Sequence, residues 1–269
     1  MRAMALRIAR LNSRALVRVA GADWRPFLHN LLTHDMLGLA PGELRFGGLL
    51  TPQGRILHDL FVHAGDDDAL IDVAAEGRDD FVKRLRLYRL RAKLDIEPTD
   101  GGVWAAFGGE PEPAWPTDPR LPKLGSRTTG DMPAEAETAS EDDYRSFQLS
   151  LGVPDPARDR TDSTYPIEAN WDLLNGVDFQ KGCFIGQETT SRMKRRGVIK
   201  TRTLPLTFDG LPPPFGAEVL AGDLRAGEVL SGVQNRAMAV LRLDRIGSVD
   251  LTSGGRPVRV SWPGWMPRP

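Results

Sequence analysis

The stretch Lys-Gly-Cys-Phe-Ile-Gly-Gln-Glu, residues 181–188, is the most informative part of this chain of 269 residues. It holds the only cysteine, Cys183, between Gly182 and Gly186, and a helix is expected to follow it. A thiol just before a helix lies at the positive end of the helix dipole, and Lys181 adds a second positive charge. Both effects lower the pKa of a thiol. Two alternatives stay open: a reactive or ligand-contacting thiol, or a small buried apolar side chain.

The glycines of this stretch allow the backbone to approach a ligand closely. The stretch is not a phosphate-binding loop, because neither Gly-x-x-x-x-Gly-Lys-Ser/Thr nor Gly-x-Gly-x-x-Gly occurs there. Any function of this segment is therefore expected to involve the thiol and its neighbours rather than a nucleotide phosphate.

Upstream of the stretch, apolar periodicity and turn residues predict an α+β region with antiparallel strands. Asp23 is a plausible N-cap for the first helix, which begins near Trp24. The aspartates at residues 66–68 are interpreted as a solvated hairpin tip rather than a metal site. The expected elements are strands 16–20, 45–50, 56–64, 69–74, 93–97 and 103–107, and helices beginning near 24 and spanning 78–91.

Two further regions differ in composition. Residues 110–133 are rich in proline and are expected to be irregular with one short strand, because helices and central strands tolerate proline poorly. The prolines of this segment are Pro111, Pro113, Pro116, Pro119, Pro122 and Pro133. A helix is expected over residues 142–152. After residue 196, short strands alternate with Gly/Pro-rich turns, which predicts a small β-barrel. The strands are expected at 201–208, 217–220, 228–233, 237–242 and 257–262.

Composition limits the cellular setting. The net charge of −1 gives no overall attraction to nucleic acid or anionic lipid, so direct nucleic-acid binding is not expected. No apolar run is long enough to span a bilayer, and Arg7 and Arg10 interrupt any signal-peptide core. One cysteine excludes an internal disulfide. Together these features predict a cytoplasmic protein that does not associate with membranes.

The octapeptide and its surroundings resemble the YgfZ family, which is similar in sequence and fold to the glycine-cleavage T-protein, a tetrahydrofolate-dependent aminomethyltransferase. The upstream element Pro-Ile-Glu-Ala-Asn, residues 166–170, resembles most closely the branch of mitochondrial iron–sulfur assembly factors. The hairpin at 49–64 and the helix at 78–94 occur in the matching order. The resemblance covers nearly the whole chain and is weakest at residues 110–139 and in the last seventy residues.

The resemblance implies an α+β fold of the T-protein type. Two ferredoxin-like α+β units and a C-terminal β-barrel would form a ring around a central channel. The expected domains are a folate-binding region, residues 1–196, and the barrel, residues 197–269. The implied function is that of a folate-binding accessory factor in iron–sulfur cluster assembly or repair, with client enzymes that include those that thiolate transfer RNA. The implied partners are tetrahydrofolate or a derivative, and iron–sulfur assembly or client proteins; no stably bound metal is expected.

The family's functional positions carry over one by one. Cys183, Lys181 and Asp59 are implied as the residues of the chemistry, and Asp59 lies where the T-protein has its catalytic aspartate. A strand carboxylate that faces a channel can act as a base; an outward-facing surface aspartate is the alternative. The residues implied to bind the cofactor are Arg14, Tyr144, Glu168, Asn170, Gly182, Gln187, Glu188 and Arg192.

Two departures from the family pattern bear on chemistry. Ser150 stands where the T-protein has an acid that contacts the pterin, and a hydroxyl cannot make the paired charge-assisted bonds of a carboxylate. Arg14 and Tyr144 stand where the bacterial branch has tryptophans that flank the folate. These departures argue against the runner-up function, an aminomethyltransferase-like one-carbon transferase, and leave open whether the protein is an enzyme.

The remaining polar candidates have simpler explanations. His29, His34, His58 and His63 form pairs five residues apart, which fits neither one helical face nor one face of a strand. They are interpreted as structural or solvent-facing. The basic run at residues 194–196 is either a solvated helix end, favoured by the dipole, or a contact for the folate tail or a nucleic-acid phosphate.

Overall fold

The computed structural model describes residues 5–110, 114–132, 136–155, 157–247 and 250–268. Pro111, Pro113 and Pro133 of the proline-rich segment lie outside the described residues. The chain forms two compact units. Unit 1 comprises Met1–Tyr144 and Leu174–Gln187, and unit 2 comprises Arg145–Leu173 and Glu188–Pro269. The predicted domain division after residue 196 does not follow these units and stays a prediction.

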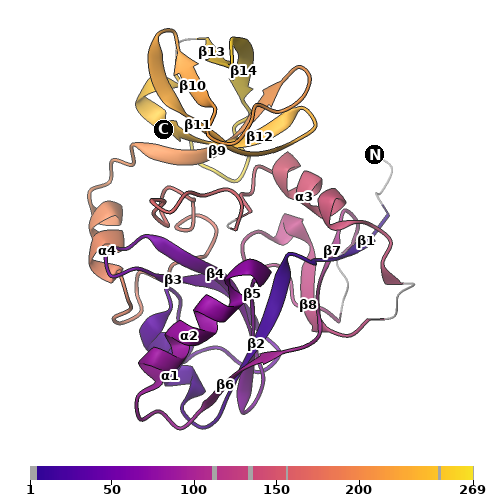
Figure 1. Ribbon diagram of the computed structural model, residues 1–269, viewed down its shortest axis with the longest axis vertical. Coiled ribbons are helices and arrows are strands. Elements are labelled where there is room, and N and C mark those ends of the chain that lie inside the picture. Colours follow the sequence, from indigo (N-terminus) through magenta and orange to yellow (C-terminus); the bar gives the residue numbers. More distant parts are fainter. Residues whose placement is uncertain (1–4, 111–113, 133–135, 156, 248–249, 269) are drawn as a thin grey trace. The chain divides into compact units, whose positions relative to one another are not determined.

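Unit 1 is built on a five-stranded antiparallel sheet with the strand order β3-β4-β5-β2-β6 (Figure 1). The strands predicted at 45–50 and 56–64 are confirmed as the hairpin β3 and β4, and β5 follows it in the sheet. The strands are β2 (Arg14–Ala20), β3 (Leu44–Leu50), β4 (Ile56–Ala64), β5 (Asp68–Ala74) and β6 (Asp95–Thr99).

Two helices, α1 (Trp24–Leu31) and α2 (Arg78–Arg89), bury their apolar stripes against one face of this sheet. Leu28 and Phe81 are both fully buried there, and each such side chain stabilises the fold by roughly 1.5–3 kcal/mol. Asp23 does occupy the N-cap position of α1, but it makes no capping bond. Its carboxylate instead accepts a hydrogen bond from the backbone N–H of Lys93 at 2.7 Å.

A second, three-stranded sheet in unit 1 has the order β1-β7-β8. The strand predicted at 103–107 is confirmed as β7 (Gly102–Phe107), and the short strand predicted in the proline-rich segment is β8 (Ser126–Gly130). The edge strand β1 (Arg7–Arg10) was not expected; in it two arginines flank the adjacent residues Ile8 and Ala9. Short 3-10 helices of this unit include η1 (Ala75–Gly77) and η2 (Pro122–Leu124).

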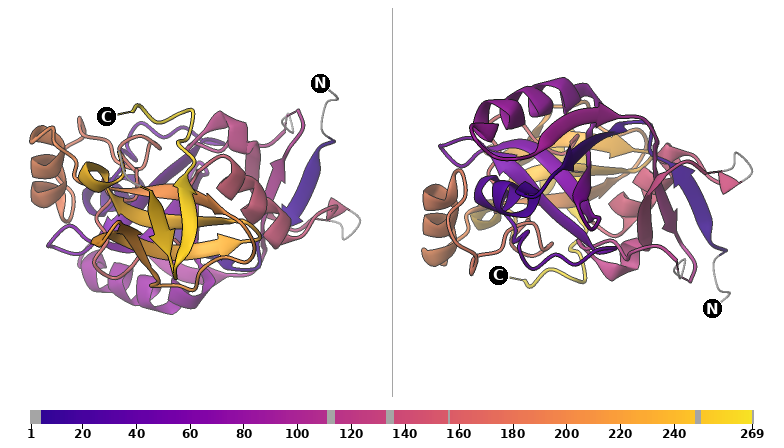
Figure 2. Two further views of the ribbon diagram at one scale, coloured as in Figure 1. Left: turned by 90° about the horizontal axis from the view of Figure 1, so that it is seen from above. Right: turned by 90° about the horizontal axis from the view of Figure 1, so that it is seen from below.

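Unit 2 contains a closed barrel with the strand order β10-β11-β12-β9-β14-β13, drawn from orange to yellow in Figures 1 and 2. The predicted barrel is confirmed, and only the three-residue strand β13 was not expected. The strands are β9 (Thr201–Phe208), β10 (Glu218–Ala221), β11 (Leu224–Val233), β12 (Arg236–Arg242), β13 (Leu251–Ser253) and β14 (Arg256–Val260), with η4 (Leu243–Arg245) after β12.

The remaining helices are α3 (Glu141–Ser150) and α4 (Gln187–Arg195), both close to their predicted positions. None of the helices in the described part of the chain has the length and apolar character needed to cross a bilayer. The α+β fold class and the C-terminal barrel are therefore confirmed, while the central channel stays a prediction.

A buried carboxyl group in unit 2 makes the stability of this unit depend on pH. Asp159 is 3% exposed; it accepts hydrogen bonds from the hydroxyl of Ser231 on β11 and from the N–H of Asp155. Burial, together with the charge of Asp155, raises the pKa of Asp159 from 3.8 to about 7. Between pH 4 and 7 the folded chain keeps this proton while the unfolded chain loses it. The free energy of unfolding therefore falls as pH rises through this window.

We predict that Asp159→Asn increases the free energy of unfolding at pH 8 by a few kcal/mol, because each displaced pKa unit corresponds to about 1.4 kcal/mol. The amide keeps an acceptor for Ser231 and carries no charge. At pH 4 the variant and the wild-type protein should have nearly equal stability. Urea unfolding at both pH values measures this difference, and an equal effect at both would contradict the assignment.

Candidate functional site

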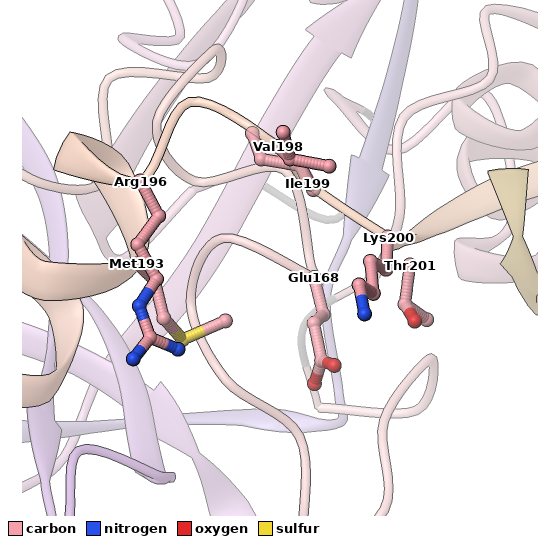
Figure 3. Close-up of a pocket in the computed structure, with 7 residues that line it drawn as sticks. All are labelled: Glu168, Met193, Arg196, Val198, Ile199, Lys200 and Thr201. Carbon is pink, nitrogen blue, oxygen red and sulfur yellow. The ribbon is translucent and has the colours of Figure 1, made fainter.

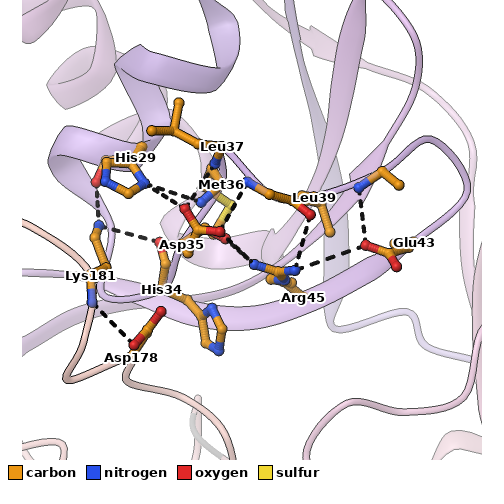
Figure 4. Close-up of polar contacts among 12 residues, drawn as sticks. His29, His34, Asp35, Met36, Leu37, Leu39, Glu43, Arg45, Asp178 and Lys181 are labelled. Carbon is orange, nitrogen blue, oxygen red and sulfur yellow. Dashed lines mark hydrogen bonds and ion pairs between the residues drawn. The ribbon is translucent and has the colours of Figure 1, made fainter.

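The Lys181 side chain anchors the octapeptide to the end of α1 (Figure 4). Its ammonium group donates hydrogen bonds to the carbonyl oxygens of His29, Leu32 (2.6 Å) and His34 (3.3 Å). The last carbonyls of a helix have no partner within the helix, so Lys181 supplies donors that α1 itself lacks. Lys181 is 8% exposed, so its positive charge, which was expected beside the thiol, is engaged in hydrogen bonds to these carbonyl groups.

This environment changes the ionisation of Lys181. Burial lowers the pKa of its ammonium group from 10.5 to about 8, although the charges of Asp35, Asp178 and Cys183 act in the opposite direction. Asp178 also shapes the backbone here, because its carboxylate accepts hydrogen bonds from the N–H groups of Gln180 and Lys181. The approach to the octapeptide is thus a compact turn rather than a free loop.

The segment that provides these carbonyls is itself held in place by Asp35. Its carboxylate accepts hydrogen bonds from the N–H groups of Leu37 and Gly38 and forms an ion pair with Arg45, and Nδ1 of His29 lies 2.9 Å away. Burial opposes ionisation of Asp35, but these N–H groups and Arg45 outweigh it and keep the pKa of Asp35 below 3.8. Lys181 therefore binds to a preformed segment.

Gly186 fixes the other end of the octapeptide. Its φ of +82° is in the left-handed region, and a Cβ atom there would lie 2.7 Å from the carbonyl oxygen of Thr51 and 2.8 Å from Cα of Gly54. Only glycine permits this approach to the β3–β4 turn. Gln187, the first residue of α4, donates from its side chain to the carbonyl of Gly182 at 3.3 Å. The octapeptide therefore forms a closed loop.

Cys183 lies between these anchors and is exposed, as is Gly182. The alternative of a small buried apolar side chain is therefore wrong. The thiol is free and forms no disulfide. What the loop presents to solvent is a thiol on a rigid backbone.

A second group of predicted residues lies on the sheet face opposite α1 and α2. Leu60 and Val62 of β4 pack with the helices, so the alternate residues Asp59, Phe61 and His63 point to the other face. Phe61 pairs with Phe46 of β3 and with Asp72 of β5. This second face is called the polar face below.

Three arginine–aspartate pairs are buried on the polar face. Arg14 donates from Nη1 to Asp59 and from Nε to Asp72, both at 2.6 Å. Arg127 of β8 also binds Asp72 at 2.5 Å. None of these side chains is more than 6% exposed. Asp59 is therefore neither the outward-facing aspartate of the alternative interpretation nor an unpaired base.

The pairing governs how these groups ionise. Burial alone would lower the pKa of the Arg14 guanidinium, but the charges of Asp59 and Asp72 outweigh it and raise the pKa above its ordinary value. Burial would raise the pKa of Asp72, but Arg127 and Arg14 lower it below 3.8. Arg14 and Asp72 are therefore both held in their charged forms, each by a partner of opposite charge.

Tyr144 belongs to the same polar face through Arg120. The guanidinium of Arg120 binds Asp118 at 2.7 Å and the Tyr144 hydroxyl at 3.2 Å. It also lies over the Phe61 ring, 4.9 Å from its centroid, and Arg127 lies 4.1 Å from the same centroid. Tyr144 is 3% exposed and packs edge-on against Phe107. The structure thus brings together Arg14, Asp59 and Tyr144.

The other predicted residues lie in unit 2. The carboxylate of Glu168 accepts a hydrogen bond from the N–H of Tyr165 and lines a cavity (Figure 3). Asn170 is fully buried with a φ of 64°, and its side-chain amide donates to the carbonyl of Thr203 at 2.7 Å. Glu188 and Arg192 are exposed on α4. Among the described residues, no hydrogen bond or ion pair joins Cys183 to Arg14, Asp59 or Tyr144.

The histidines are mainly structural. His58 pairs with Asp80 of α2 at 2.9 Å, and burial lowers its pKa. Burial also lowers the pKa of His34, and it lowers that of His63 to about 4. The Nε2 atom of His63 is buried without a hydrogen-bond partner among the described residues. His63 on the polar face is therefore neither solvent-facing nor fully satisfied.

Four of the six charged residues of the polar face were not predicted from the sequence, namely Asp72, Asp118, Arg120 and Arg127. Asp118 and Arg120 lie in the proline-rich segment, whose composition gave no sign of a buried ion pair. Asp72 did carry a signal, because it is a single acid between Ile71 and Val73 in an apolar strand. A buried charge in such a strand calls for a partner. For described residues, no group of three histidine, cysteine or acidic side chains is arranged to hold a metal ion.

Comparison with known proteins identifies the family. Residues 200–268 match the model of the CAF17 C-terminal β-barrel domain. The chain is 31% identical to the Neurospora crassa "Iron-sulfur cluster assembly factor IBA57 homolog, mitochondrial", covering 83% of this chain and 58% of that protein. It is 30% identical to the mouse "Iron-sulfur cluster assembly factor IBA57, mitochondrial", covering 96% of this chain and 85% of the mouse protein.

Among solved structures, the aminomethyltransferase T of the glycine cleavage system from Bartonella henselae shares the fold, with a TM-score of 0.78. At 17% identity, the similarity covers 99% of this chain and 88% of that structure. The fold is therefore that of the T-protein. The similarity to the mouse protein and the match to the barrel model show that the chain belongs to the YgfZ/CAF17 family.

The comparison contradicts the predicted cytoplasmic location, because the relatives carry the designation mitochondrial. The prediction was wrong because it depended on a lone cysteine and on the absence of an apolar leader. Neither feature separates one reducing compartment from another.

We predict that Asp59→Ala lowers the free energy of unfolding by about 3–5 kcal/mol, because it removes one partner of a buried pair. The matched control is Asp68→Ala, which breaks the exposed Arg18–Asp68 pair of the same 2.6 Å length. Its cost should be below about 1 kcal/mol. Urea unfolding of both variants tests this, and equal losses would show that the polar face does not depend on its charges.

Proposed function

We propose that this protein is an accessory factor for the assembly or repair of iron–sulfur clusters in client enzymes, with Cys183 as its functional thiol. The observation that carries the proposal is the exposed Cys183 on a loop held by Lys181 and Gly186. Relatives of the same family are named iron–sulfur cluster assembly factors. The proposed partners are proteins of iron–sulfur assembly and their clients, including enzymes that thiolate transfer RNA.

The loop geometry supports a role for the thiol in contact with a partner. A cysteine used only for packing is normally buried. Cys183 instead faces solvent, between the buried Lys181 and Gly186, which has a positive φ. Because the anchors fix the backbone, a partner would meet the thiol in one position, and little conformational entropy would be lost on binding. Lys181 is a positioning residue in this arrangement.

The proposal predicts that Cys183→Ser folds with unchanged stability but does not rescue a strain that lacks this maturation function. The substitution changes one exposed sulfur atom, so packing is not affected. Thiolated transfer RNA, measured by mass spectrometry in the complemented strain, should remain at the level of the empty vector. Cys183→Ser should unfold at the same temperature as the wild-type protein.

Exposed Ser163 provides the control for this experiment: Ser163→Ala should rescue fully. Full rescue by Cys183→Ser would overturn the thiol role.

A reduced folate is proposed as a second ligand, on the polar face. The unsatisfied Nε2 of His63 fits a heterocycle that can form a hydrogen bond, and Arg14 and Tyr144 lie on or against the same face. A bound folate would supply a one-carbon carrier. His63, Arg14 and Tyr144 would then bind and orient its ring.

The geometry does not support aminomethyl transfer, the alternative function. A base at Asp59 would need a free carboxylate, but Arg14 holds this group at 2.6 Å. Ser150 donates its hydroxyl to the Phe147 carbonyl of its own helix at 2.7 Å, so it does not replace the missing acid.

Calorimetric titration tests the folate proposal. Tetrahydrofolate should bind saturably, and His63→Leu should weaken the affinity about tenfold, the cost of one buried hydrogen bond. The control His58→Leu changes the opposite face of the sheet and should leave binding unchanged. No heat of binding, or equal effects of the two variants, would contradict a folate site on the polar face. Turnover of an aminomethyl donor would instead favour the transferase.

A further inference from the structure

Unit 2 contains a cavity of about 550 Å³ (Figure 3), a volume within the range of small-molecule sites. Three segments form its wall: α4 with the residues just after it, the start of β9, and the loop that carries Glu168. The lining residues are Glu168, Met193, Arg196, Val198, Ile199, Lys200 and Thr201.

The cavity has an excess of positive charge. Arg196 and Lys200 form no ion pair or side-chain hydrogen bond with any described residue, whereas nearby Lys194 and Arg202 share the carboxylate of Asp172. Glu168 is the single acid among the residues lining the cavity, and the Tyr165 N–H already donates to it. Two cations without a partner at one cavity favour an anionic ligand.

The rest of the wall is apolar. Figure 3 shows Val198 and Ile199 on one side of the cavity, with Arg196 and Lys200 on either side of Glu168. Val198 is 74% exposed, although its side chain would gain roughly 1.5–3 kcal/mol from burial. Gly197, with a φ of +71°, ends α4 and reverses the chain so that Val198 reaches this position. A ligand with an apolar part would cover this surface.

The floor of the cavity is preorganised. The Thr203 N–H donates to the Glu168 carbonyl at 2.7 Å, and Asn170 donates to the Thr203 carbonyl at the same distance. Arg202 donates to the Ile167 carbonyl at 2.6 Å. These bonds fix the loop of Glu168 to β9, so ligand binding would not have to order it.

We propose that this cavity binds a small organic anion, one carboxylate or phosphate group on an apolar body. Arg196 and Lys200 bind the anionic group, and Met193, Val198 and Ile199 contact the apolar part. This binding proposal is independent of the proposed thiol and folate roles, because it rests on none of the residues assigned to them. The apolar wall distinguishes such a ligand from a nucleic-acid phosphate, which the basic run at residues 194–196 alone would also accept.

Isothermal titration of the full chain tests the proposal, with sodium hexanoate as the carboxylate probe and phenyl phosphate as the phosphate probe. At least one should bind saturably and more tightly than inorganic phosphate, which lacks an apolar part. The tighter of the two identifies the anionic group. Binding should weaken as salt increases.

Variants locate the site. Arg196→Met and Lys200→Met should each weaken binding about tenfold, since each removes a charged hydrogen-bond donor. Val198→Ser should weaken binding of the organic probes and leave binding of inorganic phosphate unchanged. All three positions lie at exposed or partly exposed sites, so the thermal unfolding temperature should not change. Lys123→Met, which removes an exposed cation of unit 1, is the matched control.

Absence of saturable binding by both organic probes overturns the proposal. The proposal is also overturned if Arg196→Met and Lys200→Met bind the probes as tightly as the control variant Lys123→Met does. Binding of a single-stranded oligonucleotide that depends on these two cations, without binding of either organic probe, would overturn it in favour of a nucleic-acid contact.

Discussion

The ammonium group of Lys181 completes the end of α1, and the presentation of Cys183 depends on this interaction. A helix ends with carbonyl groups that need donors, and here two of those donors come from a residue about 150 positions away in sequence. The same bonds that complete the helix hold the octapeptide against unit 1. The structure thus explains the sequence signature. Lys181 anchors the octapeptide to α1, Gly186 permits close contact with the β3–β4 turn, and Cys183 between them is exposed to solvent.

The polar face depends on a different interaction, the buried ion pair. Its arginines and aspartates are charged yet buried, and each charge is tolerated because an opposite one lies within hydrogen-bonding distance. Buried ion pairs contribute little net stability compared with apolar packing. The stability of the fold therefore does not by itself explain why six such residues lie beside two phenylalanine rings.

Local patterns in the sequence were sufficient to predict most of the helices and strands. Alternation in β2 and β4, the turn before Ile56 and the amphipathic stripe of α2 each depend on near neighbours, and these elements were predicted. The strand β1 was missed because its sequence, Arg-Ile-Ala-Arg, does not alternate, and β13 was missed because three residues are too short for a period to show. The barrel was expected because its strands are separated by Gly/Pro-rich turns of regular spacing.

The site was predicted less completely, because its contacts join distant parts of the chain. Arg127 and Asp72 are 55 residues apart, and Arg14 and Asp72 are 58 apart. Periodicity does not show which strand face becomes buried, so Asp59 had two interpretations. Family resemblance identified Arg14, Asp59 and Tyr144, but it could not show that arginines neutralise the acids among them.

The shared carboxylate of Asp72 has a consequence for how this protein can change over time. Because Asp72 serves both Arg14 and Arg127, while Arg14 also serves Asp59, loss of any one member leaves the others unbalanced in a dry environment. Viable descendants are therefore expected to exchange these residues in sets of opposite charge. Correlated replacement at positions 14, 59, 72 and 127 among relatives would be the historical trace of that constraint.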